Sequence, residues 1–356
     1  FIAAISWMSG ESSYAVTMLI LAASGYYILS GLITPVWNSL IGDLVPAAVR
    51  GSFFGKRSKV IGMATFTSMF AAGQTLELFK SLGSAALGFS TIFATAFAVR
   101  LLAAYYFTQH ADPPYHVSGQ DRFSLLDFLV RMPYSNFARF VLFVSLFNCA
   151  IWTAAPYFSV YMLRDLGLSY SQFTALGAAQ VLTQILTLQS WGALADRFGS
   201  KRILSASAKG ITLIPFLWLV SSEIWYLVFV QLTAGVVWAG FNLALSTFLF
   251  DAVTPPKRAR CVAYQSVVNG IFTLIGSLVG GYLATHLSYP LAWERWLWVP
   301  KSSYLTIFFL SGCLRILVTV GWLRIFREVR AVEDIGRTDL IFRIAHVRPL
   351  AGLISV

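Results

Sequence analysis

Polar amide and indole side chains recur one helical turn apart inside otherwise apolar stretches of this chain. Residues four apart share a face of a helix, so each such pair presents its hydrogen-bonding groups together. These groups donate and accept hydrogen bonds without carrying charge, which suits a neutral, polyhydroxylated or amphipathic ligand held between aromatic walls. Hydrogen bonds that only join one helix to another are the alternative interpretation. The cavity candidates are the pairs Asn148 and Trp152, Gln180 and Gln184, and Trp238 and Asn242, with Tyr26, Tyr27, Ser68 and Asn269 at matching depth.

Residues for metal, nucleophilic or nucleotide chemistry do not form a recognisable pattern. The four histidines lack ligand spacing, and the three cysteines, Cys149, Cys261 and Cys313, have no paired spacing for a disulfide framework. The chain also has no glycine-rich phosphate loop of the kind that binds ATP. We therefore expect no cofactor, no metal site and no enzymatic activity.

The composition indicates that the elements holding these residues lie in a membrane. Hydrophobic residues make up 57% of the 356 residues, charged residues only 12%, and the mean hydropathy is +0.71. An α-helix needs about 20 apolar residues to cross about 30 Å of hydrocarbon. The stretches that meet or approach this length predict nine membrane-spanning helices and a stub at 1–10. The expected spans are 14–41, 58–79, 82–107, 138–162, 170–191, 203–222, 224–250, 262–286 and 303–326.

Lysine and arginine predict the orientation of these helices. Most of the 26 basic residues fall in alternate loops and in the tail. Cytoplasmic loops of bacterial inner-membrane proteins carry this excess. We therefore place loops 42–59, 108–139, 192–209 and 251–260 and the C-terminus in the cytoplasm of a multi-pass inner-membrane protein. The net charge of +11 is then a topology signal, and no nucleic-acid partner is expected.

One charged segment, Gly192 to Arg202, reads G-A-L-A-D-R-F-G-S-K-R between two apolar stretches. It resembles the cytoplasmic loop signature of the major facilitator superfamily, which lies between the second and third helices and again between the eighth and ninth. A second pattern supports the resemblance, because the segment from Asp43 to Arg50 recurs 208 residues later as Asp251 to Arg258. This repeat indicates two homologous halves.

The resemblance implies an all-α bundle of two six-helix halves around a central cavity. We expect an N-terminal half at 1–107, a cytoplasmic linker at 108–137, a C-terminal half at 138–326 and a tail at 327–356. The repeat places the partner of Gly192 before residue 1, so we expect the family's first two helices to be missing here. The linker and the tail from Glu328 are read either as helices on the membrane surface or as solvated segments.

The implied function is secondary or facilitated transport of a small solute by alternating access, in a monomer, with H⁺ or Na⁺ as the candidate coupling ion. A transporter-like protein that serves as a sensor or assembly partner is the alternative. The family's aspartate is thought to meet the N-terminus of a helix in the opposite half, and here Asp196 would meet residues 52–55. A basic loop that only fixes topology is the other reading. The gating candidates are Gly192, Asp196, Arg197, Gly199, Lys201, Arg202, Asp43, Arg50, Asp251 and Arg258.

Three charges fall inside predicted helices, and their roles stay open at this stage. Arg100 and Arg315 occupy comparable places in the last helix of each half, where both could extend toward the cytoplasm or contact a ligand. Glu77 lies near the outer end of its helix and is a candidate for proton coupling.

Overall fold

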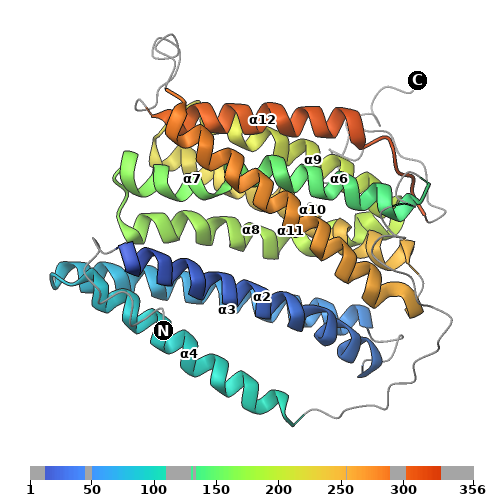
Figure 1. Ribbon diagram of the computed structural model, residues 1–356, viewed down its shortest axis with the longest axis horizontal. Helices are drawn as coiled ribbons and strands as arrows, with labels where there is room; N and C mark the ends of the chain where they lie inside the picture. The colour runs from blue at the N-terminus through green and yellow to red at the C-terminus, as the bar shows by residue number, and fades with distance from the viewer. Residues whose placement is uncertain are drawn as a thin grey trace, which may run out of the picture. The chain divides into compact units, whose positions relative to one another are not determined.

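A computed structural model describes residues 13–44, 50–109, 130, 134–253, 255–288 and 302–329 of the chain (Figure 1). The described residues form two compact units. Unit 1 takes residues from 1–123, 159–178 and 255–266, and unit 2 takes residues from 124–158, 179–254 and 267–356. The units are therefore not simple consecutive halves of the chain. The division at residues 107 and 138, which follows from the sequence repeat, stays a prediction.

Unit 1 is built on three helices, α2 (Ser13–Leu44), α3 (Arg50–Ser81) and α4 (Ala85–Phe107). A tight turn joins α3 to α4, and Gly83 there has a φ of 80°, a conformation that glycine adopts without strain. Gly88 lies close to Leu76 and Phe79, which brings the two helices together beside the turn. From there α4 diverges from α3 (Figure 1).

Unit 2 holds most of the remaining helices. In chain order they are α6 (Asn136–Trp152), α7 (Ala155–Val160), a π-helical turn (Tyr161–Asp165), α8 (Tyr170–Phe198), α9 (Ser200–Leu217), α10 (Ile224–Ala252), α11 (Pro255–His286) and α12 (Ser303–Trp322). Two stretches of this list belong to unit 1: residues 159–178, which include the π-helical turn and the beginning of α8, and residues 255–266 at the beginning of α11. Helix α9 packs against α10 and α12, and α6 packs against α12 (Figure 1).

Aromatic side chains form the core at one end of unit 2. Phe140 stacks on Phe248 with ring centroids 4.3 Å apart, and the ring of Phe326 meets both edge-on. Phe143 extends the cluster along α6. Phe140 and Phe143 come from α6, Phe248 comes from α10, and Phe326 comes from the segment after α12. Burial of these rings therefore holds the three elements together.

The helices agree with the expected all-α membrane fold. Within the described ranges, five segments are long and apolar enough to cross a membrane: Ala85–Phe107, Asn136–Asp165, Ile224–Ala252, Arg260–His286 and Ser303–Trp322. Several expected boundaries differ from the structure, since α3 begins at Arg50 instead of residue 58, α11 begins at Pro255 instead of 262, α9 ends at Leu217 instead of 222, and α6 ends at Trp152 within the expected span 138–162. Helix α8 continues through the expected loop to Phe198, so Gly192 to Phe198 is helical, and α12 ends at Trp322 instead of residue 326.

Several predictions fall outside the described residues. These are the stub at 1–10, the linker helix within 108–137 and the tail beyond residue 329. The side chains of Tyr27, Asp43, Arg50 and Arg258 are also outside the description, although each residue lies in a helix.

Candidate functional site

Asn269 on α11 is the centre of a polar cluster in unit 2. Its side-chain oxygen accepts hydrogen bonds from the Ser145 hydroxyl at 2.9 Å and from the Asn148 amide at 3.3 Å, both on α6. Ser145 is fully buried. A buried polar group in a membrane helix needs such partners, because leaving it unbonded is costly. The structure thus brings together Asn148 and Asn269, two of the predicted cavity residues.

Two glycines on α11 set the register of this cluster. A Cβ atom on Gly276 would lie 2.3 Å from the carbonyl oxygen of Cys149, and one on Gly280 would lie 2.3 Å from that of Thr153. Both carbonyl oxygens belong to the backbone, so a change of side-chain rotamer could not relieve the clash. Small residues four apart let helix backbones approach closely. The glycines therefore hold α11 against α6 at the height where Asn269 reaches Ser145 and Asn148.

Gln265 lies one turn before Asn269 on the same face of α11. Its side-chain oxygen is buried and has no hydrogen-bond partner. Gln265 belongs to the part of α11 assigned to unit 1, and a buried acceptor without a partner carries a desolvation cost. Neither Gln265 nor Ser145 was among the sequence candidates. Their positions, four residues before Asn269 and three before Asn148, are the signal that could have found them.

The other cavity candidates are spread more widely. Trp152 is 40% exposed, and Asn242 is also exposed. Trp238 meets Phe241 edge-on, with ring centroids 5.8 Å apart. In unit 1, Ser68 is exposed. Asn242 and Ser68 therefore do not join the Asn269 cluster.

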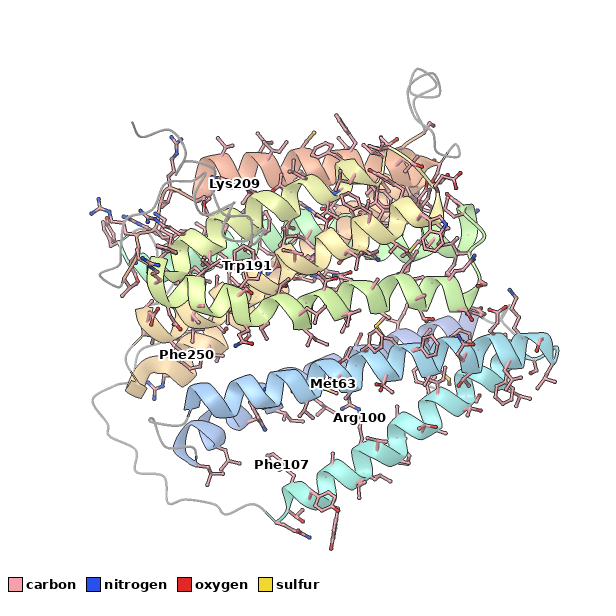
Figure 2. The ribbon with its side chains drawn as sticks, turned by 180° about the vertical axis from the view of Figure 1, so that it is seen from behind. Met63, Arg100, Phe107, Trp191, Lys209 and Phe250 are labelled. Atoms are coloured by element: carbon pink, nitrogen blue, oxygen red, sulfur yellow. The ribbon has the colours of Figure 1, made fainter. Side chains whose placement is uncertain are left out.

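Gln180 and Gln184 are half-buried on α8. A Cβ on Gly235 of α10 would lie 2.3 Å from the carbonyl oxygen of Gln180, so α8 and α10 approach closely here. The Trp191 indole donates to the carbonyl of Val236 at 2.8 Å further along the same helix pair (Figure 2). The Trp191 hydrogen bond thus holds α8 against α10. The positions of Gln180 and Gln184 depend on this contact between the two helices.

The charged signature segment forms a helix junction. Only Gly199, with a φ of 89°, separates α8 from α9. The hydroxyl of Ser200 lies 2.9 Å from the Thr247 hydroxyl and 3.3 Å from a carboxylate oxygen of Asp251, both on α10. Asp196 and Arg197 are exposed at the end of α8, and Arg202 is half-buried. The junction therefore joins the signature to Asp251, a residue of the repeated loop.

Glu328, beyond α12, caps the start of α9. Its Oε2 accepts the backbone N–H of Lys201 at 2.7 Å, where the helix N-terminus favours negative charge. A Cβ on Gly199 would lie 2.3 Å from that oxygen, so Gly199 also makes room for the carboxylate. Burial lowers the pKa of the Lys201 ammonium, and the nearby Glu328 opposes this shift. The sequence reading of Glu328 as a surface or solvated residue missed this role.

The segment that carries Glu328 is fastened to the start of α6 as well. The Asn136 side chain donates to the carbonyl of Arg327 at 2.9 Å and accepts from its N–H at 2.7 Å. Phe326 lies in the aromatic core, with the Lys201 ammonium 5.4 Å from its ring centre. The end of α12 therefore joins α6, α9 and α10 at one end of unit 2.

The two helix-borne arginines differ. Arg315 on α12 is 3% exposed, donates through Nη1 to the Ile211 carbonyl at 3.1 Å, and has no partner for its Nε. Of the two roles left open for Arg315, extension toward the cytoplasm does not agree with this burial. Arg100 on α4 is exposed, bonds the Tyr26 hydroxyl and lies 4.8 Å above that ring (Figure 2).

A family model described as the Major Facilitator Superfamily matches residues 140–352. The chain belongs to the major facilitator superfamily. It is thus a multi-pass membrane protein of a transporter family, as its apolar helices indicate. Membership points to a transporter and away from an enzyme, and among the described residues no group of acidic, histidine or cysteine side chains has metal-site geometry.

Relatives match over part of their length. The efflux pump azaK of Aspergillus niger is 29% identical over 157 residues, which cover 43% of this chain and 31% of the relative. The quinolone resistance protein NorA of Staphylococcus aureus is 29% identical over 148 residues, covering 41% of this chain and 38% of NorA. The chain thus aligns with about a third of each relative's length. The crystal structure of a mutant nucleoside transporter NupG superposes with a TM-score of 0.47 at 13% identity, covering 82% of this chain and 87% of that one.

Proposed function

We propose that this superfamily member is a secondary or facilitative transporter that moves a small neutral or amphipathic solute by alternating access. The observation that carries the proposal is the Ser145–Asn148–Asn269 cluster in unit 2. These groups offer hydrogen bonds without charge. Relatives named as an efflux pump and a quinolone resistance protein support an amphipathic substrate.

We further propose that the indoles of Trp152 and Trp238 supply the aromatic walls of the site. Trp152 lies four residues after Asn148, and Trp238 lies four before Asn242 on α10. An indole supplies a flat apolar wall together with one N–H donor. The proposed site therefore holds the apolar part of a solute against indoles and its polar part against amides.

We test the site by comparing Asn269→Ala with Ser266→Ala in proteoliposomes. Ser266 is an exposed residue on the same helix whose hydroxyl bonds its own backbone at Val262. Losing a specific hydrogen bond to a solute costs about 1.4 kcal/mol, so Asn269→Ala should raise KM about tenfold. The two probes are a quinolone and a neutral monosaccharide. Equal KM values for the two variants would refute the assignment.

The signature segment would act as a latch on the cytoplasmic side. Asp196 is proposed to hold the opposite half, supported by Arg197, Lys201 and Arg202, with Asp43, Arg50, Asp251 and Arg258 as the paired groups of the repeated loops. Asp196 is exposed at the end of α8. Asp196→Asn should slow transport and alter cysteine accessibility, and unchanged behaviour in both assays would exclude the latch.

Orientation and energy coupling complete the proposal. We place the basic loops and the C-terminus in the cytoplasm of the inner membrane, and take H⁺ or Na⁺ as the candidate coupling ion. Flux measured under an imposed pH gradient and then under an imposed Na⁺ gradient distinguishes these ions. Flux that follows the solute gradient alone indicates facilitated diffusion. Flux of neither probe, with both ions present, would favour the alternative of a sensor or assembly partner.

A further inference from the structure

Glu77 on α3 meets the beginning of α8 within unit 1. Its Oε2 accepts the backbone N–H of Tyr170, the first residue of α8, at 3.1 Å. The first N–H groups of a helix have no partner inside the helix and carry partial positive charge. A carboxylate at this point both satisfies a donor and interacts favourably with the helix dipole.

Part of the α8 N-terminus is capped from within its own sequence. The N–H of Gln172 donates to the Ser169 hydroxyl at 3.2 Å, and the N–H of Ser169 donates to the Gln172 side chain at 3.0 Å. This reciprocal pair is a capping box. The capping box does not include the N–H of Tyr170. Glu77, on another helix, supplies the acceptor for this N–H.

Close packing supports the contact between α3 and α8. A Cβ on Gly73 would lie 1.9 Å from Oγ1 of Thr174, and one on Gly177 would lie 2.3 Å from Cε of Met69. Met69, Gly73 and Glu77 are spaced four apart and share one face of α3. That face therefore approaches α8 closely over two turns, and Glu77 stands at its end.

Other side chains surround the Glu77 contact. The Lys80 ammonium lies 5.5 Å from the centre of the Tyr170 ring, and Phe89 meets the same ring edge-on at 6.2 Å. Thr174 is 7% exposed. Glu77 and Tyr170 are half-buried beside it, so the contact lies at the edge of the packed region.

The repeat assigns α3 to the first predicted half and α8 to the second. If the halves rock about a central site, contacts that join them at one side must break when that side opens. We propose that Glu77 is a latch at the predicted outer side, which holds that side closed by capping α8. The inference rests on the proposed alternating access, and it places a carboxylate at a helix N-terminus on the side opposite Asp196.

The test measures how fast a cysteine at position 174 reacts with a membrane-impermeant maleimide from the predicted outer side. Cys149, Cys261 and Cys313 are first replaced by alanine. Glu77→Gln keeps the shape of the side chain and removes its charge, so it should raise the labelling rate of T174C about two- to fivefold. Glu77→Asp keeps the charge and should restore most of the protection.

The matched control is Glu223→Gln. Glu223 immediately precedes α10, but its side chain makes no capping hydrogen bond. It should leave the labelling rate unchanged. If Glu77→Gln lowers the melting temperature without raising the rate, Glu77 is only a structural cap and the latch is refuted. Equal rates in the Glu77→Gln and Glu223→Gln proteins would refute it too.

Labelling needs no solute, so the result is separate from the substrate assignment. If Glu77→Gln raises the labelling rate but neither probe is transported, the latch is supported and the proposed substrate class is wrong. Flux with unchanged labelling supports transport and removes Glu77 from the gate.

Discussion

Arg315 and Arg100 occupy comparable places in the last helix of each predicted half, yet their surroundings are opposite. In unit 2, α12 buries Arg315 against the backbone of α9. In unit 1, Arg100 remains exposed and contacts the Tyr26 side chain. Their helices differ in the same way, since 39% of the most apolar stretch of α12 is buried but only 6% of that of α4.

The contrast shows that an apolar helix has two ways to carry a charged group. Where neighbouring helices cover it, the group takes partners from the surrounding backbone, because isolated charge in a low-dielectric interior is expensive. Where the helix surface is open, a nearby side chain is enough. A substitution should therefore cost more in unit 2 than the matched substitution in unit 1.

The largest expected difference lies between the arginines themselves. Arg315→Ala leaves a cavity and an unpaired Ile211 carbonyl, and should lower the free energy of unfolding by about 2–4 kcal/mol. Arg100→Ala should cost about 1 kcal/mol or less, the scale of an exposed cation–π contact. Thermal unfolding in detergent measures both.

Arg315→Met is the control for this pair. It keeps most of the volume and removes the buried charge, so it should cost less than Arg315→Ala. Equal losses from Arg315→Ala and Arg100→Ala would show that the two surroundings are energetically alike.

Glycines should give effects of opposite sign in the two units. Gly276→Ala places a methyl group against the Cys149 carbonyl and should destabilise by about 1–3 kcal/mol. Nothing lies within 4 Å of a Cβ on Gly25 of α2, so Gly25→Ala should stabilise by about 0.5–1 kcal/mol through helix propensity. Melting temperatures that move in the same direction would contradict this.

Capping gives a smaller difference. Glu328→Ala removes the acceptor for the Lys201 N–H and should destabilise unit 2 by about 1 kcal/mol. Glu223→Ala removes a carboxylate that makes no such bond and should change stability by about 0.5 kcal/mol or less. Hydrogen exchange at the first amides of α9 locates the effect, and unchanged exchange there would rule out the cap.

Single hydroxyl groups give the smallest difference. Ser311→Ala deletes a buried donor to the Ala150 carbonyl, 2.5 Å away, and should cost about 1 kcal/mol. Tyr26→Phe deletes the exposed acceptor for Arg100 and should cost about 0.5 kcal/mol or less. A larger loss from Tyr26→Phe than from Ser311→Ala would reverse the comparison.

The helices of this chain follow from its charge-free stretches, because spanning a membrane demands long apolar segments. The end of α8 could not be predicted in this way, because the charged signature resembles a loop, whereas the helix continues through Asp196 and Arg197 to Phe198. Asn148 and Asn269 could be assigned by depth alone. Ser145, Gln265 and Glu328 could not, because their roles depend on which helix lies opposite each side chain.

The paired hydrogen bonds between Asn136 and the backbone of Arg327 have a mechanical consequence. They tie the beginning of α6 to the chain that leaves α12, so the two ends of the segment from α6 to α12 are fastened at one point. These bonds resist any motion that separates the beginning of α6 from the end of α12. A force that pulls on α6 would therefore also act on the end of α12, so the two helices would move together instead of separating.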